Sequence, residues 1–313
     1  MPPSSNKPRI VVFGYDRLLL DSLDTLGGAG AEIVSVVFPA TRADARANEI
    51  RDEVRSRRLE IVEQPRKESA GGFTEQINAL EPEIVFVWSY PMILPREVIE
   101  IPRLGCINLH MGLLPQYRGV NGLKWALLNG EAETGVTLHY MDEGIDTGDM
   151  IARVAFPITG DDDLVSLMRK GRYAGIHLLK NSWHSIADGS ATRMPQDESI
   201  AGYYSAAMEP SREIDWSRPA IEIHNLIRAS PPPFKGAHTF FRGERIVVRR
   251  SVALEDHCRD EPGTVVAAGA DGFTAATAVG SLLLKGVEAG KNGESVHYSH
   301  FGIEVGVRLG TSK

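Results

Sequence analysis

The stretch RIVVFGYDRLLLDSLDTLGGAG, residues 9–30, decides the fold class. It opens with a short apolar run, rich in β-branched residues, that ends at Gly14, and then repeats apolar residues at helical spacing until a group of glycines. This pattern predicts a strand, a turn and a helix. Similar strand-like runs follow at 32–38, 59–64 and 82–90, with helix-like segments between them. Strands that alternate with helices predict an α/β sheet of parallel crossover units, whose ligands bind beyond the carboxyl ends of the strands.

The alternation continues in the middle of the chain. LGCINLH (104–110) and GVTLHYM (135–141) are predicted strands. Residues 146–158 are predicted to form an extended arm rather than part of the sheet. Apolar residues at helical spacing then predict a long helix from Leu164 to about Asp188, with Gly189 at its end.

The last third of the chain has a different character. Residues 190–210 are polar and irregular, which is typical of a linker. Short strands separated by turn signals such as RGER, ADGF and KNGE follow, and they predict a small antiparallel β-barrel. With 313 residues, the chain is expected to form two domains, 1–203 and 204–313.

Composition restricts the class of protein. The chain is 42% hydrophobic and 24% charged, as in an ordinary soluble globular protein. Its two cysteines, Cys106 and Cys258, fit neither a disulfide framework nor a zinc site, which favours a reducing, cytoplasmic setting. The sequence shows no secretion signal and no run of membrane-spanning length, so no membrane association is expected.

The charge is distributed unevenly. The formal net charge is −7, and residues 204–313 are neutral, with 13 Lys and Arg against 13 Asp and Glu. Residues 1–203 therefore carry the whole negative excess. Proteins that bind nucleic acid through phosphate contacts usually have a basic surface, so this balance argues against a nucleic-acid partner.

A polar pair stands at the end of one predicted strand, in INLHMGLLPQYRG (107–119). Asn108 and His110 are two residues apart and therefore lie on the same face of the strand. An amide can donate to a developing oxyanion while an imidazole moves a proton, which is the chemistry of acyl transfer. A capping role at a turn is the alternative for such a pair.

A second polar cluster, MDEGIDTGDM (141–150), holds three aspartates and two glycines directly after a predicted strand. An aspartate at this place can orient His110 and stabilise its protonated form. Aspartates in a solvated loop with no further role are the alternative.

The order of these motifs resembles the folate-dependent formyltransferase family. NLHMGLLPQYRG followed by ALLNGEAETGVTLHYMDEGIDTGDM is similar to the family's Asn-x-His, Ser-Leu-Leu-Pro, Arg-Gly and Asp-x-Gly-Asp pattern, and IDWSRPAIEIHNLIRA (214–229) resembles the start of its C-terminal domain. The resemblance implies an N-formyltransferase with a Rossmann-like domain, an OB-like barrel and 10-formyltetrahydrofolate as formyl donor.

The resemblance also implies roles for particular residues. The matched catalytic residues are Asn108, His110 and Asp146. The matched pterin-contacting segments contribute Tyr90, Met92, Ile93, Leu94 and Asp142. One position departs from the pattern, since Gly112 stands where the family usually has Ser, and the hydroxyl that would help to fix the loop is missing.

The acceptor amine follows less directly from the resemblance. His139, in TLHYMD, and Trp125, in GLKWALLNGE, resemble formyltransferases that act on small molecules, including amino sugars. The arginines of PATRADARANEIRDEVRSRR (39–58) alternate with acids and lack the Lys-rich character of methionyl-tRNA enzymes. A nucleotide-linked amino sugar is therefore the expected acceptor. Hydroxyornithine, methionyl-tRNA and an inactive folate- or sugar-binding module are the alternatives.

Four residues are candidates for binding the acceptor: Gly14, Tyr15, Arg118 and His139. Arg118 can bind a diphosphate or close onto a carboxylate, and His139 can be a core histidine bonded to backbone. The remaining histidines, among them His177, His184, His297 and His300, complete no metal-ligand set, so no metal is expected. The sequence leaves the oligomeric state open, with a homodimer as one possibility.

Overall fold

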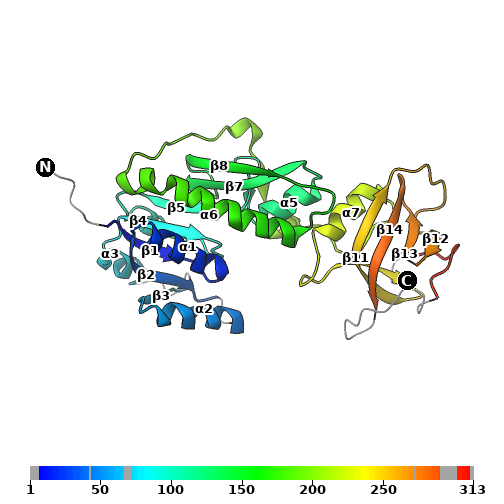
Figure 1. Ribbon diagram of the computed structural model, residues 1–313, viewed down its shortest axis with the longest axis horizontal. Helices are drawn as coiled ribbons and strands as arrows, with labels where there is room; N and C mark the ends of the chain where they lie inside the picture. The colour runs from blue at the N-terminus through cyan, green and yellow to red at the C-terminus, as the bar shows by residue number, and fades with distance from the viewer. Residues whose placement is uncertain (1–6, 42–43, 67–71, 271, 290–301, 311–313) are drawn as a thin grey trace. The chain divides into compact units, whose positions relative to one another are not determined.

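The computed structural model describes residues 7–41, 44–66, 72–270, 272–289 and 302–310. The chain divides into two compact units, drawn in Figure 1. The first contains Met1–Gly122, Gly135–Phe156 and Lys170–Tyr204, and the second contains Leu123–Thr134, Pro157–Arg169 and Ser205–Lys313. The main change of unit therefore falls after Tyr204, while two short segments from the first part of the sequence belong to the second unit.

A seven-stranded sheet forms the centre of the first unit, in the order β3-β2-β1-β4-β5-β7-β8. The strands of this sheet are β1 Arg9–Phe13, β2 Glu32–Pro39, β3 Ile61–Gln64, β4 Ile84–Trp88, β5 Cys106–His110, β7 Glu133–Tyr140 and β8 Met150–Pro157. The helices of this part of the chain are α1 Arg17–Gly28, α2 Ala45–Ser56, α3 Phe73–Ala79, α4 Arg96–Ile99, α5 Gly122–Leu128 and α6 Leu164–Asp188. All but the first residue of α5, and the first residues of α6, belong to the second unit. Strands β1 to β5 are parallel to one another, as the alternating pattern predicts.

The far side of this sheet differs from the prediction. Strand β7 runs antiparallel to β5, and β8 joins the sheet as its edge strand instead of forming a separate arm. The sheet is therefore mixed. The helix-like segment between β5 and β7 predicts that these two strands are parallel, because a helix commonly connects parallel strands. The direction of a strand, however, depends on tertiary contacts that the local sequence pattern does not determine.

Each sheet face has its own apolar core, because successive strand residues point to opposite faces. Ile10 and Val12 of β1 pack in one cluster with side chains from α1 and α6, and Figure 1 shows these helices on the same face. Val11 and Phe13 pack on the other face with side chains from α3 and α4. The apolar residues of β5 also alternate between the two faces. The position of a polar residue along β5 therefore determines the face on which its side chain lies.

Helix α6 begins and ends at the residues that the sequence indicates. The Asp163 carboxylate accepts from the backbone N–H of Ser166 at 2.8 Å, while Ser166 Oγ accepts from the Asp163 N–H at 3.1 Å. This reciprocal arrangement satisfies N–H groups that have no partner within the helix. Gly189 ends the helix with a φ of 77°, which favours glycine.

The second unit is built around a five-stranded antiparallel sheet, in the order β10-β11-β14-β13-β12. Its elements are α7 Ala220–Arg228, β10 Ala237–Phe241, β11 Glu244–Leu254, β12 Val265–Gly269, β13 Gly272–Ala276 and β14 Ser281–Ala289. Gly310 bridges Phe240 in one edge strand, and Arg308 bridges Thr264 next to the other. The final described segment therefore connects both edges of the sheet, which fits the predicted barrel.

Local sequence explains parts of this second unit. Arg242 and Gly243, the two residues between β10 and β11, both have positive φ, as the central residues of a type I′ hairpin turn do. Trp216 packs inside the core of this unit and donates its indole N–H to Thr239 Oγ1 at 3.0 Å. The KNGE turn predicted near residue 292 lies outside the described residues. No helix of the described segments is long and apolar enough to cross a membrane.

Candidate active site

Strands β5 and β7 place three polar side chains together. Asn108 and His110 lie on the face of the sheet opposite to the core that contains Ile107 and Leu109. In the antiparallel register Asn108 is directly opposite His139. Asn108 Nδ2 lies 3.1 Å from His139 Nε2. The polar pair Asn108 and His110 of β5 is therefore joined by His139 of the neighbouring strand β7.

The loop after β7 adds Asp146 to this group. Its Oδ1 lies 3.3 Å from Asn108 Nδ2 and 3.4 Å from His139 Nε2, and its Oδ2 lies 3.5 Å from His110 Nδ1. The backbone N–H of Gly119 donates to Oδ2 at 2.8 Å. The structure therefore brings the three predicted catalytic residues together, with His139 as a fourth member.

The partners of each imidazole define its tautomer. His139 Nδ1 lies 2.8 Å from the carbonyl oxygen of Tyr140, and a carbonyl can only accept, so Nδ1 carries the hydrogen. In a ring with a single hydrogen, Nε2 then accepts from the Asn108 amide. By the same argument His110 Nε2 donates to the carbonyl oxygen of Tyr117 at 2.6 Å. His110 Nδ1, which faces Asp146, is the nitrogen that can take up a proton.

Burial and charge act in opposite directions on these groups. Burial lowers the pKa of His110, and the attraction of Asp146, which raises that pKa, does not fully offset burial. Burial alone raises the pKa of Asp146, but the imidazoles of His110 and His139 and the N–H of Gly119 hold it well below its usual range. Burial therefore favours the neutral form of His110, whereas the ionised carboxylate of Asp146 favours its protonated form.

The Asn108 amide has two acceptors, His139 Nε2 and Asp146 Oδ1, both at more than 3.0 Å. Long hydrogen bonds are weak and easily exchanged. An oxyanion close to Asn108 can replace one of them. The arrangement can thus stabilise a tetrahedral oxyanion through Asn108 and receive a proton at His110 Nδ1.

Gly112, where the sequence departs from the family pattern, has a steric role. A Cβ atom at this position would lie 2.8 Å from His110 Nε2 and 3.2 Å from the Tyr117 carbonyl oxygen. Gly122 approaches the same ring, since a Cβ there would lie 3.3 Å from His110 Nε2. The His110–Tyr117 hydrogen bond therefore depends on the absence of a side chain at Gly112.

The predicted pterin-contacting loop follows β4. Tyr90 packs its ring edge-on against Phe13, 5.3 Å between centroids, and its hydroxyl is buried without a hydrogen-bond partner in the described part of the chain. Burial raises the pKa of Tyr90. Leu94 is buried in the core, the Ile93 side chain is 81% exposed and Met92 is half-buried. Because these three side chains differ in exposure, a ligand in contact with all three residues would contact their backbone.

Gln64, at the end of β3, contacts this loop and was missed by the sequence analysis. Its Nε2 donates to the carbonyl oxygen of Ile93 at 2.9 Å, while its Oε1 is buried without a partner among the described residues. Gln64 precedes a proline at the carboxyl end of a strand, which is the only sequence signal that marks it. Asp142, on the opposite segment, accepts from the Gly144 N–H at 3.0 Å and from Thr147 Oγ1 at 2.5 Å, and so shapes its own turn.

The other candidates for acceptor binding are placed differently. Arg118 is fully buried, and its guanidinium group bonds Glu198 through two nitrogens at 2.9 and 2.6 Å. This is the alternative in which Arg118 closes onto a carboxylate. Gly14 lies at the carboxyl end of β1, packed on Leu19, and the neighbouring Tyr15 is half-buried against the core. The Gly14 N–H donates to the carbonyl oxygen of Val37 on β2 at 3.2 Å, rather than to the Asn108 group.

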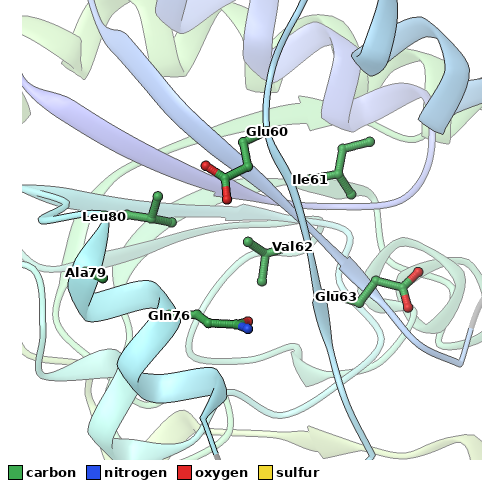
Figure 2. A pocket seen from close by; sticks show the side chains of 7 residues that line it. All are labelled: Glu60, Ile61, Val62, Glu63, Gln76, Ala79 and Leu80. Carbon is green, nitrogen blue, oxygen red and sulfur yellow. The ribbon is translucent and has the colours of Figure 1, made fainter.

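The cavities in the described part of the first unit include two of different size. The larger, of about 530 Å³, lies between β3 and α3 and contains none of the predicted site residues (Figure 2). The smaller, of about 300 Å³, is lined in part by Asp142, Met141 and Arg193. No group of three potential metal ligands occurs among the described residues, and His297 and His300 lie outside them, so the absence of a metal stays a prediction.

A mixed sheet that presents an amide, an imidazole and a carboxylate, followed in sequence by a small antiparallel β unit, has the groups that a group-transfer enzyme of the acyl-transfer class needs. Residues 9–181 match the formyl transferase family, and residues 209–298 match the formyl transferase C-terminal domain. The chain belongs to this family. It is a folate-dependent formyltransferase, with 10-formyltetrahydrofolate as the donor.

Known proteins resemble the chain over both units. It is 32% identical over 286 residues to a methionyl-tRNA formyltransferase of Acetivibrio thermocellus, covering 90% of this chain and 91% of that protein. A methionyl-tRNA formyltransferase of Trichlorobacter lovleyi is 34% identical over 285 residues, covering 90% and 89%. An N-formyltransferase from Helicobacter canadensis, solved with folinic acid and dTDP-3-aminofucose, shares the fold with a TM-score of 0.67 and 19% identity, covering 89% of this chain and 99% of that one.

Proposed function

We propose that the formyl acceptor is the amino group of methionyl-tRNA. The observation that carries this proposal is the length of the similarity, since 32–34% identity to methionyl-tRNA formyltransferases extends over about 90% of both chains. It supports an acceptor that the sequence analysis ranked below a nucleotide-linked amino sugar.

The roles of the site residues are part of the proposal. A neutral amine attacks the formyl carbon and forms a C–N bond, and the Asn108 amide donates to the oxyanion. The amine proton passes to His110 Nδ1, where Asp146, 3.5 Å away, stabilises the resulting charge. The bond from the formyl carbon to the folate nitrogen then breaks, and the proton held by His110 goes to the leaving nitrogen. Atoms and charges balance over the two steps.

The donor fits the residues around the loop after β4. Gln64 Oε1 and the Tyr90 hydroxyl are buried polar atoms without partners among the described residues, and such atoms are costly unless a ligand satisfies them. A pterin ring carries N–H groups and ring nitrogens that can do so. We propose that the pterin is held by Tyr90, Met92, Ile93 and Leu94, with Asp142 on the opposite side. We also propose that catalysis takes place in a domain formed by residues 1–203 and that residues 204–313 form a second domain.

A nucleotide-linked amino sugar is a second candidate, favoured by His139 and by charge. His139 contacts both Asn108 and Asp146, at the position whose sequence context resembles small-molecule enzymes. Helix α2 and the residue after it carry three arginines that form ion pairs with acids of α2, α1 and β3. These ion pairs are Arg51–Glu63, Arg55–Asp52 and Arg57 with both Asp24 and Glu53. Arginines that are already neutralised contribute little to the binding of tRNA phosphates.

A competition between acceptors tests the proposal. The full chain is incubated with 10-formyltetrahydrofolate and methionyl-tRNA, or with dTDP- and UDP-linked amino sugars or hydroxyornithine, and both tetrahydrofolate release and the mass of the formylated product are measured. Asn108→Ala in parallel corrects for uncatalysed transfer. We expect formyl-methionyl-tRNA with the highest kcat/KM. Formylation of an amino sugar with methionyl-tRNA left unchanged would overturn the acceptor, and no transfer to any amine would favour the binding module.

A further inference from the structure

The segment 194–204, which the sequence presents as part of a linker, belongs to the first unit and contacts the loop that carries Asp146. Met194 forms an antiparallel bridge with Met150, at one end of that loop. Tyr203 and Tyr204 form β9, which pairs in parallel with β6, Arg118–Gly119. The segment therefore runs alongside two pieces of the site.

Asp146 needs support because its backbone is in an unfavourable conformation. Its φ is 55°, in the left-handed region that a residue with a side chain rarely adopts. Gln196 Nε2 donates to the carbonyl oxygen of Asp146 at 2.8 Å and to that of Gly148 at 2.7 Å. Both amide hydrogens of one side chain are thus used on the two residues that bracket Thr147.

Arg118 fixes the orientation of this amide. Its Nε donates to Gln196 Oε1 at 3.0 Å, so a flipped amide would place donor against donor. Glu198 holds the two terminal nitrogens of Arg118, and Tyr203 bonds the same guanidinium group. The strand that carries Arg118 also carries Gly119, whose N–H binds the Asp146 carboxylate. One short strand therefore restrains Asp146 both directly and through Gln196.

We propose that Gln196 is a positioning residue for formyl transfer, which holds the Asp146 carboxylate against His110 and Asn108 and is itself fixed by the Arg118–Glu198 pair. This inference rests on the proposed role of Asp146. The distances of 3.5 Å to His110 and 3.3 Å to Asn108 depend on the loop, because Asp146 belongs to no strand. A rotation of the loop would separate the carboxylate from both partners without disturbing the sheet.

Substitution of Gln196 by Leu, which has a similar size and no hydrogen-bonding groups, tests the proposal in the full chain. We expect kcat to fall about 10- to 100-fold, as for a misplaced catalytic group, while KM for 10-formyltetrahydrofolate and the melting temperature stay close to wild type. Gln76→Leu, at an exposed position on α3, is the matched control and should change neither kcat nor KM.

A double-mutant cycle separates positioning from a structural role. If Gln196 acts through Asp146, Gln196→Leu should cause little further loss in an Asp146→Asn background. The inference would be overturned if the fold losses of kcat in the two single variants multiply in the double variant. A Gln196→Leu variant with a lower melting temperature and unchanged kcat would also overturn it. If the Leu variant does not fold, Gln196→Glu, which places a carboxylate oxygen against the two loop carbonyls, is expected to give the same loss of kcat, and a Glu variant with wild-type kcat would also overturn it.

The wild-type reaction distinguishes the two proposals. A wild-type enzyme that transfers formyl to no acceptor in the same assay contradicts the proposed function. Wild-type turnover with an unchanged Gln196→Leu variant contradicts only the role of Gln196. A second readout is independent of turnover, because loss of Asp146 from its place removes the attraction that raises the pKa of His110, and NMR titration of the His110 ring should then report a lower pKa.

Discussion

Asn108 and Asp146 reach the same site in different ways, and the contrast separates what local sequence determines from what it does not. Asn108 lies within a buried strand, and the register with β7 places it opposite His139. Asp146 lies in a loop with a positive φ, and its supports, Gly119 and Gln196, are far from it in sequence. The strand side is rigid because its backbone hydrogen bonds are part of the sheet, whereas the loop side depends on a few side-chain contacts.

The strand side of the comparison gives the largest expected effect. Asn108→Ala removes the amide that donates to the oxyanion, and the loss of one such donor lowers kcat by about 10²- to 10³-fold. The sheet should be unaffected, since the alanine keeps the backbone pairing of β5. Steady-state kinetics and thermal unfolding of the purified variant measure both quantities. Turnover near wild type would show that Asn108 is not the oxyanion donor.

The strand side could be predicted from sequence because its signals are local. A buried apolar run with Asn108 and His110 two residues apart specifies both a strand and the face that the pair shares. Helix α6 was equally accessible, since apolar spacing marks its body and Gly189 marks its end. These features need only neighbouring residues for their prediction.

The loop side could not be predicted in the same way. Gln196 lies in a polar segment without periodicity, and nothing in that segment indicates that it holds residues 50 positions earlier in the chain. The antiparallel direction of β7 and the enclosure of Arg118 by Glu198 also arise from tertiary contacts. Sequence resemblance identified Asp146, but the conformation that places it next to His110 had no local signal.

Gly112 offers a way to disturb the strand side without changing a polar group. In Gly112→Ser the new Cβ would lie 2.8 Å from His110 Nε2, so the ring must move and its hydrogen bond to Tyr117 is lost. We expect kcat to fall about 10- to 100-fold, the range for a displaced catalytic group, although serine is the residue that the family pattern contains. Gly160→Ser is the control, because a Cβ there meets no atom within 4 Å. Higher activity in Gly112→Ser would mean that the ring has a second productive position.

The pH dependence of kcat probes the contact between the two sides. His110 must be neutral to accept the amine proton, so kcat should fall as the pH falls through its pKa, which burial places below the usual value for histidine. Asp146 raises that pKa, and Asp146→Asn should therefore move the acidic limb of the profile to lower pH, in addition to reducing kcat. Asp161→Asn, an exposed change elsewhere, should leave the limb in place. A shift to higher pH in Asp146→Asn would contradict the pairing of Asp146 with His110.

Substitution of Thr147 is expected to have the smallest effect on the kinetic constants, and it tests which part of the Asp146 loop binds the donor. Its Oγ1 donates to Asp142 at 2.5 Å, next to the N–H of Gly144 that binds the same carboxylate oxygen. Thr147→Val keeps the shape and removes one exposed hydrogen bond, which contributes about 0.5–1.5 kcal/mol at most, or a change of roughly 2- to 10-fold. Because Gln196 and Gly119 still hold Asp146, the change should appear as a higher KM for 10-formyltetrahydrofolate with kcat nearly constant. A loss confined to kcat would instead mean that Asp142 and Thr147 support the carboxylate of Asp146, and the loop would then act as one unit rather than as a donor-binding part and a catalytic part.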